Sequence, residues 1–296
     1  MRDGFAGYHP AVNMVYFAAV LVFAMFLMHP VCLLISLVSS VSYAFCLRGE
    51  QGARFKICYL LPLPVLVMLL NPLFNHRGLT VLCALPSGNP LTLESVLYGA
   101  AAGCLMAAVL SWFYCYTAVM TSDKFVYLFG RVIPSMSLVL SMTLRFVPRF
   151  RAQFQAVRQA QRCIGRDLSN GRLLQRMRHG ARILSVMVSW SMEHAVETAD
   201  SMKSRGYGLP GRTAFSIYRF QRRDGCLLAL ILLLTAYIAA GGLLGGLSFD
   251  YFPVVGGQVH GVYTVTVYIA DLILCLLPVI LHIKEAQTWK SSRLRA

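Results

Sequence analysis

Three acidic side chains that share one face of a predicted helix are the first candidates for chemistry. Glu193, Glu197 and Asp200 stand at positions i, i+4 and i+7 of that helix. Like charges at this spacing repel one another unless cations answer them. Because a strongly basic helix precedes them in the chain, we expect the acids to pair with its cations rather than to act in catalysis. A membrane-embedded enzyme that uses these acids together with His194 is the alternative interpretation.

The histidines and cysteines lack the spacing of a metal site. His179 and His194 are separated too widely for a helical zinc pair, and the sequence contains neither His-x-x-x-His nor Cys-x-x-Cys. Most of the nine cysteines lie in apolar stretches, where cysteine packs as a small hydrophobic residue. No Gly-x-x-x-x-Gly-Lys-Ser/Thr sequence is present, so the chain is not predicted to bind ATP through a P-loop. We therefore expect it to bind no metal and no cofactor.

The apolar composition predicts an all-α, polytopic membrane protein. Hydrophobic residues make up 57% of the 296 residues and charged residues only 13%, whereas soluble domains carry roughly a quarter. A helix that crosses a bilayer needs about 20 apolar residues. The hydropathy predicts six such helices, at residues 11–28, 30–47, 57–74, 91–120, 225–247 and 261–283. Pro62, Pro64 and Pro72 should break or kink the third of them.

Two features inside the predicted spans bear on function. In the fourth span small side chains recur every four residues, at Gly99, Gly103, Ala107 and Ser111. Such a face lets another helix backbone approach closely, either within this chain or from a separate membrane partner. Asp271 is the strongest candidate for an intramembrane charge, and such acids are functional by default. It supports a second alternative, a self-contained secondary transporter.

The positive charge of the chain is concentrated in residues 145–223, which hold 16 Lys and Arg against 4 Asp and Glu. The rest of the chain holds 11 basic and 8 acidic residues. The positive-inside rule places this block, the N-terminus and the basic C-terminal tail on the cytoplasmic side of a cell membrane. Because the block is flanked by spans, we expect membrane lipid and protein partners rather than nucleic acid.

The hydrophobic periodicity and the positions of glycine and proline divide the chain into five parts. They are N-terminal transmembrane helices at 1–122, interfacial or partly buried helices at 123–148, cytoplasmic basic helices at 149–223, a C-terminal transmembrane hairpin at 224–283 and a basic cytoplasmic tail at 284–296. The third part is predicted to hold one amphipathic helix at 149–164 and another at about 171–205. Their charged side chains are expected to form a network among Arg151, Arg158, Glu193, Glu197 and Asp200.

The spans around a basic two-helix block, together with the sequence Met-Lys-Ser-Arg-Gly-Tyr-Gly at 202–208, resemble the transmembrane T component of energy-coupling factor (ECF) transporters, the EcfT/CbiQ family. The resemblance covers essentially the whole chain. It implies a membrane scaffold that does no chemistry itself. Two separate cytoplasmic ATPases would hydrolyse ATP-Mg, and the scaffold would couple this to release of a vitamin or transition-metal ion from a separate substrate-binding S component.

The family carries two short Ala-Arg-Gly-like motifs, each at the end of a coupling helix, that dock into the ATPases. The second motif is matched here by Ser204, Arg205 and Gly206. The first is expected in a degenerate stretch formed by Arg162, Cys163, Ile164, Gly165 and Arg166. There Ile164 replaces the usual arginine, and a neighbouring arginine would supply the cation. An arginine suits such docking because its guanidinium offers a rigid fork of donors to a partner groove.

Overall fold

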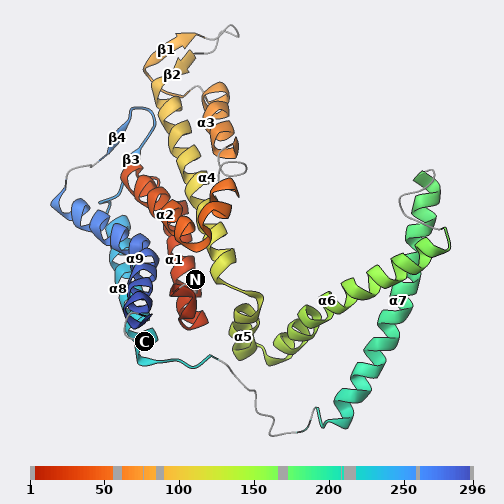
Figure 1. The fold of residues 1–296 in the computed structure, drawn as a ribbon. Coiled ribbons are helices and arrows are strands. Elements are labelled where there is room, and N and C mark those ends of the chain that lie inside the picture. The colour runs from red at the N-terminus through yellow and green to blue at the C-terminus, as the bar shows by residue number, and fades with distance from the viewer. Residues whose placement is uncertain are drawn as a thin grey trace. The chain divides into compact units, whose positions relative to one another are not determined.

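The computed structural model describes the chain in segments (Figure 1). They are residues 4–55, 62–75, 77–84, 90–165, 173–207, 209, 218–257 and 261–293. The chain divides into two compact units. Met1–Lys124 and Tyr218–Ala296 form the first, here called the bundle unit, and Phe125–Ile217 form the second, here called the basic unit.

Each apolar stretch predicted to span the membrane contains a helix among the described residues of the bundle unit. The helices are α1 (Pro10–Phe26), α2 (Pro30–Phe55), α3 (Pro62–Phe74), α4 (Leu93–Val119), α8 (Arg222–Leu243) and α9 (Val262–Arg293), and a short 3₁₀ helix, η1 (Phe5–Gly7), precedes them. Proline begins α1, α2 and α3, where its missing N–H costs nothing and its fixed φ suits the first helical turn. The all-α, polytopic class is therefore confirmed.

Within the described residues, four helices contain a segment long and apolar enough to cross a membrane. These segments are Pro30–Leu47, Leu93–Val119, Arg222–Leu243 and Val262–Glu285. Helices α1 and α3 are apolar but shorter, with 17 and 13 residues. At 1.5 Å per residue α3 covers only about 20 Å, whereas the hydrocarbon core is about 30 Å thick. Among the described residues, the proline-rich third stretch forms this 13-residue helix, with Pro72 inside it.

The small-residue face of α4 lies against its neighbours in the same chain. A Cβ placed on Gly99 would lie 2.9 Å from the Met68 carbonyl oxygen, and one on Gly103 would lie 3.0 Å from that of Pro64, so both glycines permit close contact with α3. Further along α4, the indole N–H of Trp112 donates to Ser36 on α2 (2.9 Å). Ala107 is half-buried and Ser111 is buried.

Two short antiparallel strand pairs lie between the helices of the bundle unit. Strand β1 (Val81–Ala84) pairs antiparallel with β2 (Pro90–Thr92), and β3 (Phe249–Asp250) pairs antiparallel with β4 (Gly256–Gly257). Thr92 then caps α4, because its hydroxyl accepts from the N–H of Ser95 (3.4 Å). Strands of two to four residues are too short to show an alternating pattern, which explains why the sequence did not predict them.

The basic unit contains two long helices, and one of them differs from its predicted limits. Helix α5 (Ser122–Val132) leads into α6 (Pro134–Cys163), and α7 (Leu173–Ser204) follows. The sequence predicted a separate segment at 123–148 and a helix beginning at 149, but α6 runs continuously through Pro148. Phe146 and Phe150, on either side of this proline, both contact the Trp190 ring of α7. These contacts hold the helix together where Pro148 removes one backbone hydrogen bond.

Candidate docking surface

The second predicted motif lies at the C-terminal end of α7, where the backbone closes in a Schellman turn. The N–H of Tyr207 donates to the Met202 carbonyl (3.1 Å). The N–H of Gly206 donates to the Lys203 carbonyl (3.0 Å). This pair of bonds needs a left-handed residue just after the helix, and Gly206 supplies it with a φ of +76°. Arg205 is therefore the C-cap residue, and it is exposed.

The first predicted motif lies at the C-terminal end of α6, in a similar turn. Ile164 is the C-cap residue, and Gly165 follows with a φ of +77°. The N–H of Gly165 donates to the Arg162 carbonyl (3.0 Å). Arg162 and Cys163 are exposed, while Arg166 lies outside the described residues. Ile164 and Arg205 thus occupy the same place in two helices: each is the last residue before a left-handed glycine.

The two helix ends share a backbone geometry but present different side chains. Arg205 offers a cation with several hydrogen-bond donors, whereas Ile164 is an apolar side chain with 64% of its surface exposed. An isoleucine this exposed gains from being covered, because burying its apolar surface is favourable. The two helix ends therefore differ in chemistry, one exposing a cation and the other an apolar side chain.

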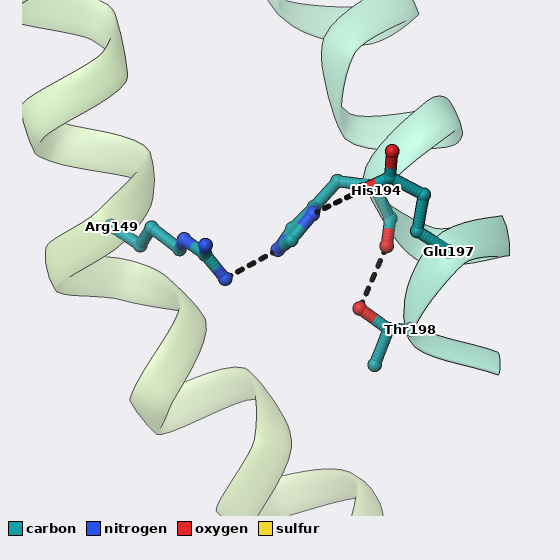
Figure 2. A network of polar contacts seen from close by, with 4 residues as sticks. All are labelled: Arg149, His194, Glu197 and Thr198. Carbon is teal, nitrogen blue, oxygen red and sulfur yellow. Dashed lines mark hydrogen bonds and ion pairs between the residues drawn. The ribbon is translucent and has the colours of Figure 1, made fainter. Parts of the chain in front are cut away.

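A polar network joins α6 to α7 (Figure 2). Arg149 Nη1 lies 2.8 Å from His194 Nε2, and His194 Nδ1 lies 3.4 Å from Glu197 Oε2. A guanidinium only donates, so the His194 Nε2 must accept, which assigns the ring proton to Nδ1 facing Glu197. On α7 itself, the Thr198 hydroxyl donates to the His194 carbonyl (2.7 Å). His194 is thus a bridge between the helices.

Aromatic stacking beside this network fixes the crossing of α6 and α7. The rings of Trp190 and His194 are nearly parallel, with centroids 5.4 Å apart and planes 14° apart. Phe146 from α6 stacks against both, at 5.7 Å from Trp190 and 6.1 Å from His194. Nearer the N-terminal end of α7, the side chains of Ile183 and Met187 are almost fully buried. Stacked rings therefore join the helix pair as well as the polar bridge.

The predicted charge network is only partly present in the described residues. Of its members, Glu197 joins the bridge through His194. Arg151, Arg158, Glu193 and Asp200 are exposed, and none of them takes part in an ion pair in the part of the chain that the structure describes. Arg149, the first residue of the helix predicted at 149–164, contacts this bridge at His194, although the predicted network did not include it. The sequence did contain a signal for this contact between the helices. Phe146 and Phe150 stand four residues apart, as do Trp190 and His194, so each pair shares one helix face.

The buried acid of the last span lies inside the bundle unit. Asp271 is 4% exposed, and the Cys275 thiol donates to its Oδ1 (3.8 Å). Together with Cys32 and Ser36 these residues line a small cavity between helices. Among the described residues, no three His, Cys, Asp or Glu side chains are grouped as a metal site requires. His179 is half-buried in α7.

Together, the fold and the apolar helices define a multi-pass, all-α membrane protein with a basic two-helix unit. Residues 7–215 match the family model CbiQ, described as cobalt transport protein. The match includes more than half of the chain and both helix-end turns. The chain belongs to the CbiQ family.

Several similar proteins carry the name energy-coupling factor transporter transmembrane protein EcfT. The protein from Lacticaseibacillus paracasei is 34% identical over 113 residues, and the one from Lactobacillus helveticus is 34% identical over 107 residues. These alignments span 38% and 36% of this chain. They cover 38% and 39% of the length of those relatives, well under half of each. A longer alignment joins the chain to the protein from Listeria innocua, with 27% identity over 227 residues, 72% of this chain and 81% of that protein.

Proposed function

We propose that this chain is the transmembrane T component of an ECF-type ABC importer and docks two ATPase subunits. The observation that carries the proposal is the repeated turn at the ends of α6 and α7, where an exposed residue precedes a left-handed glycine. Two equivalent ends in one unit suit two similar grooves on two related subunits. Membership in the CbiQ family and the EcfT names of its relatives support the same role.

The two ends would dock by different physical means. Arg205 would place its guanidinium fork against carboxylates or carbonyls in one ATPase, and Gly206 would let the two backbones approach. Ile164 would enter an apolar part of the other groove, with Arg162 or Arg166 as the nearby cation. ATP-Mg would be bound by the ATPases, and this chain would transmit their closure without chemistry of its own.

The bundle unit would hold the complex in the cell membrane and contact at least one substrate-binding S component. The basic unit and both termini would face the cytoplasm, since the positive-inside rule assigns the basic clusters to that side. The family description names cobalt, and the relatives are named as parts of energy-coupling factor transporters. The cargo class that fits both is a vitamin or transition-metal ion, captured by the S component.

The test is reconstitution of uptake in lipid vesicles. The chain is reconstituted with both ATPases and an S component, and uptake of the labelled cargo is followed with ATP-Mg on the ATPase side. The proposal predicts uptake that requires all the subunits and ATP hydrolysis. Gradient-driven uptake by the chain alone would contradict it and favour a secondary transporter built around Asp271. Turnover of a substrate by the isolated chain would instead favour an enzyme using Glu193, Glu197, Asp200 and His194.

A further inference from the structure

The N-terminal segment, residues 4–13, contacts both places where the chain passes between the two units. The chain leaves the bundle unit after Lys124 and rejoins it at Tyr218. A buried charged side chain lies beside each of these places: Lys124 is 6% exposed, and Asp224 is 2% exposed. Charged side chains are rarely buried so completely unless protein groups solvate them.

Lys124 holds the outgoing connection. Its ammonium group donates to the Ala6 carbonyl in the N-terminal segment (2.7 Å) and to the Val119 carbonyl at the end of α4 (3.0 Å). The fully buried Asn13, with its amide oriented to satisfy its neighbours, accepts from the same ammonium (3.2 Å) and donates to the Phe5 carbonyl (3.1 Å). Lys124 therefore ties α4 to both ends of the N-terminal segment at the point where the chain leaves the bundle unit.

Asp224 holds the returning connection. It is the third residue of α8, and its Oδ2 accepts from the N–H of Gln221 just before the helix (2.8 Å). Its Oδ1 accepts from the backbone N–H of His9 in the N-terminal segment (3.3 Å). One carboxylate thus caps α8 and ties the start of this helix to the same segment.

Ring contacts reinforce the returning connection. Phe220 packs edge-on against the His9 ring, with centroids 5.2 Å apart. The guanidinium of Arg223 lies 5.5 Å from the centre of the Tyr8 ring, within the range of a cation–π interaction. Burial, and then the nearby charge of Asp123, raise the pKa of Tyr218. The two ring contacts hold the start of α8 against the N-terminal segment.

The N-terminal segment is itself fixed in the core of the bundle unit. Phe5 has no exposed surface, and its ring makes edge contacts with Tyr16, Phe17 and Tyr43, at centroid distances of 5.0, 6.1 and 6.4 Å. These partners lie on α1 and α2. A displacement applied at Lys124 or Asp224 would therefore act on α1 and α2 as well as on the helix that carries each residue.

From these contacts we infer that the N-terminal segment is a coupling clamp, with Lys124 and Asp224 as its two positioning residues. The clamp receives movement of the basic unit through both chain connections and passes it to the membrane helices. This inference rests on the proposed function, since it assigns a path to ATP-driven movement. It concerns residues of the bundle unit, whereas Ile164 and Arg205, which would dock the ATPases, belong to the basic unit.

The test compares Lys124→Met and Asp224→Asn with the wild-type complex. Lys124→Met keeps the length of the side chain but removes its donors, and Asp224→Asn removes the charge. Lys124→Arg is the conservative variant, and Ser36→Ala is a matched control that removes the buried partner of Trp112 elsewhere in the bundle unit. Three quantities are measured: ATPase co-purification, ATP hydrolysis, and cargo taken up per ATP hydrolysed.

The clamp predicts that Lys124→Met and Asp224→Asn assemble with the ATPases and hydrolyse ATP, but take up about 5- to 150-fold less cargo per ATP, the usual range of coupling between sites. Lys124→Arg should recover part of the loss, and Ser36→Ala should keep the wild-type ratio. The double variant should be no worse than the more severe single variant, because both act through one segment.

The inference is overturned if both variants keep the wild-type uptake per ATP, or if Ser36→Ala lowers this ratio equally. If Lys124→Met does not assemble, Lys124→Arg and Asp224→Asn decide by the same ratio. A wild-type complex that shows no ATP-dependent uptake would refute the proposed function. If the wild-type complex shows ATP-dependent uptake and both variants keep its uptake per ATP, the clamp is refuted and the proposed function stands.

Discussion

The turn after α7 gives a prediction whose size follows from the backbone. Gly206 has a φ of +76°, a region that costs a residue with a Cβ about 1–2 kcal/mol. A new Cβ would also lie 3.2 Å from Leu209 Cδ1, the end of a flexible side chain that moves aside at little cost. In Gly206→Ala the turn that presents Arg205 should therefore be disfavoured by a factor of about 5–30.

The assay is titration of the purified ATPase pair against the chain in lipid nanodiscs. The Kd for Gly206→Ala should rise by up to the same factor of about 5–30, because the turn must re-form on docking. Gly206→Asn should be milder, since asparagine tolerates the left-handed region. Gly225→Ala is the control: it lies inside α8, and a Cβ there would meet its nearest neighbour at an ordinary 3.5 Å. A Kd for Gly206→Ala equal to that of the wild type would refute the reasoning.

Three further predictions concern the helix ends and the helix contacts. A double-mutant cycle of Arg149→Ala and His194→Ala, read from thermal unfolding, should show a favourable coupling of about 0.2–1 kcal/mol, as for exposed polar pairs; additive effects would mean that the bridge contributes nothing. Ile164→Asp should abolish co-purification of one ATPase because it places an unpaired charge in an apolar contact, whereas Ile164→Leu, which keeps an apolar side chain, should retain both ATPases; normal assembly of Ile164→Asp would mean that this end is not a docking point. Gly103→Val should lower the yield of folded protein, by a destabilisation of about 1–3 kcal/mol, because α4 must move away from α3. Gly242→Val is its control, since a Cβ there first meets Leu27 at 3.7 Å, and equal yields would contradict the close packing.

The sequence predicts the helices of the bundle unit well because long apolar runs have few alternatives in a membrane. The span predicted at 30–47 begins at Pro30, the first residue of α2, where proline suits the first turn. The predicted boundary at 148/149 was wrong, because a proline disfavours a helix only locally. The contacts of Phe146 and Phe150 with Trp190 stabilise α6 on both sides of Pro148.

The candidate site was predictable where it depends on local sequence and not where it depends on distant contacts. The left-handed glycines after Ile164 and Arg205 follow from helix-ending rules, and the structure shows both. The bridge through Arg149 and His194 joins residues 45 positions apart, so no local pattern selects this arginine over its neighbours. The burial of Lys124 likewise depends on carbonyls that only the folded chain brings together.

The central claim, that the end of α7 docks an ATPase, is tested most directly by Arg205→Ala. The measurement is co-purification of the two ATPases with the membrane-inserted chain across a salt series, beside Arg205→Lys. The account predicts that Arg205→Ala inserts normally but recruits the ATPases weakly, and that Arg205→Lys restores only part of the binding, since a point charge cannot reproduce the guanidinium fork. Wild-type recruitment and uptake in Arg205→Ala would contradict the account.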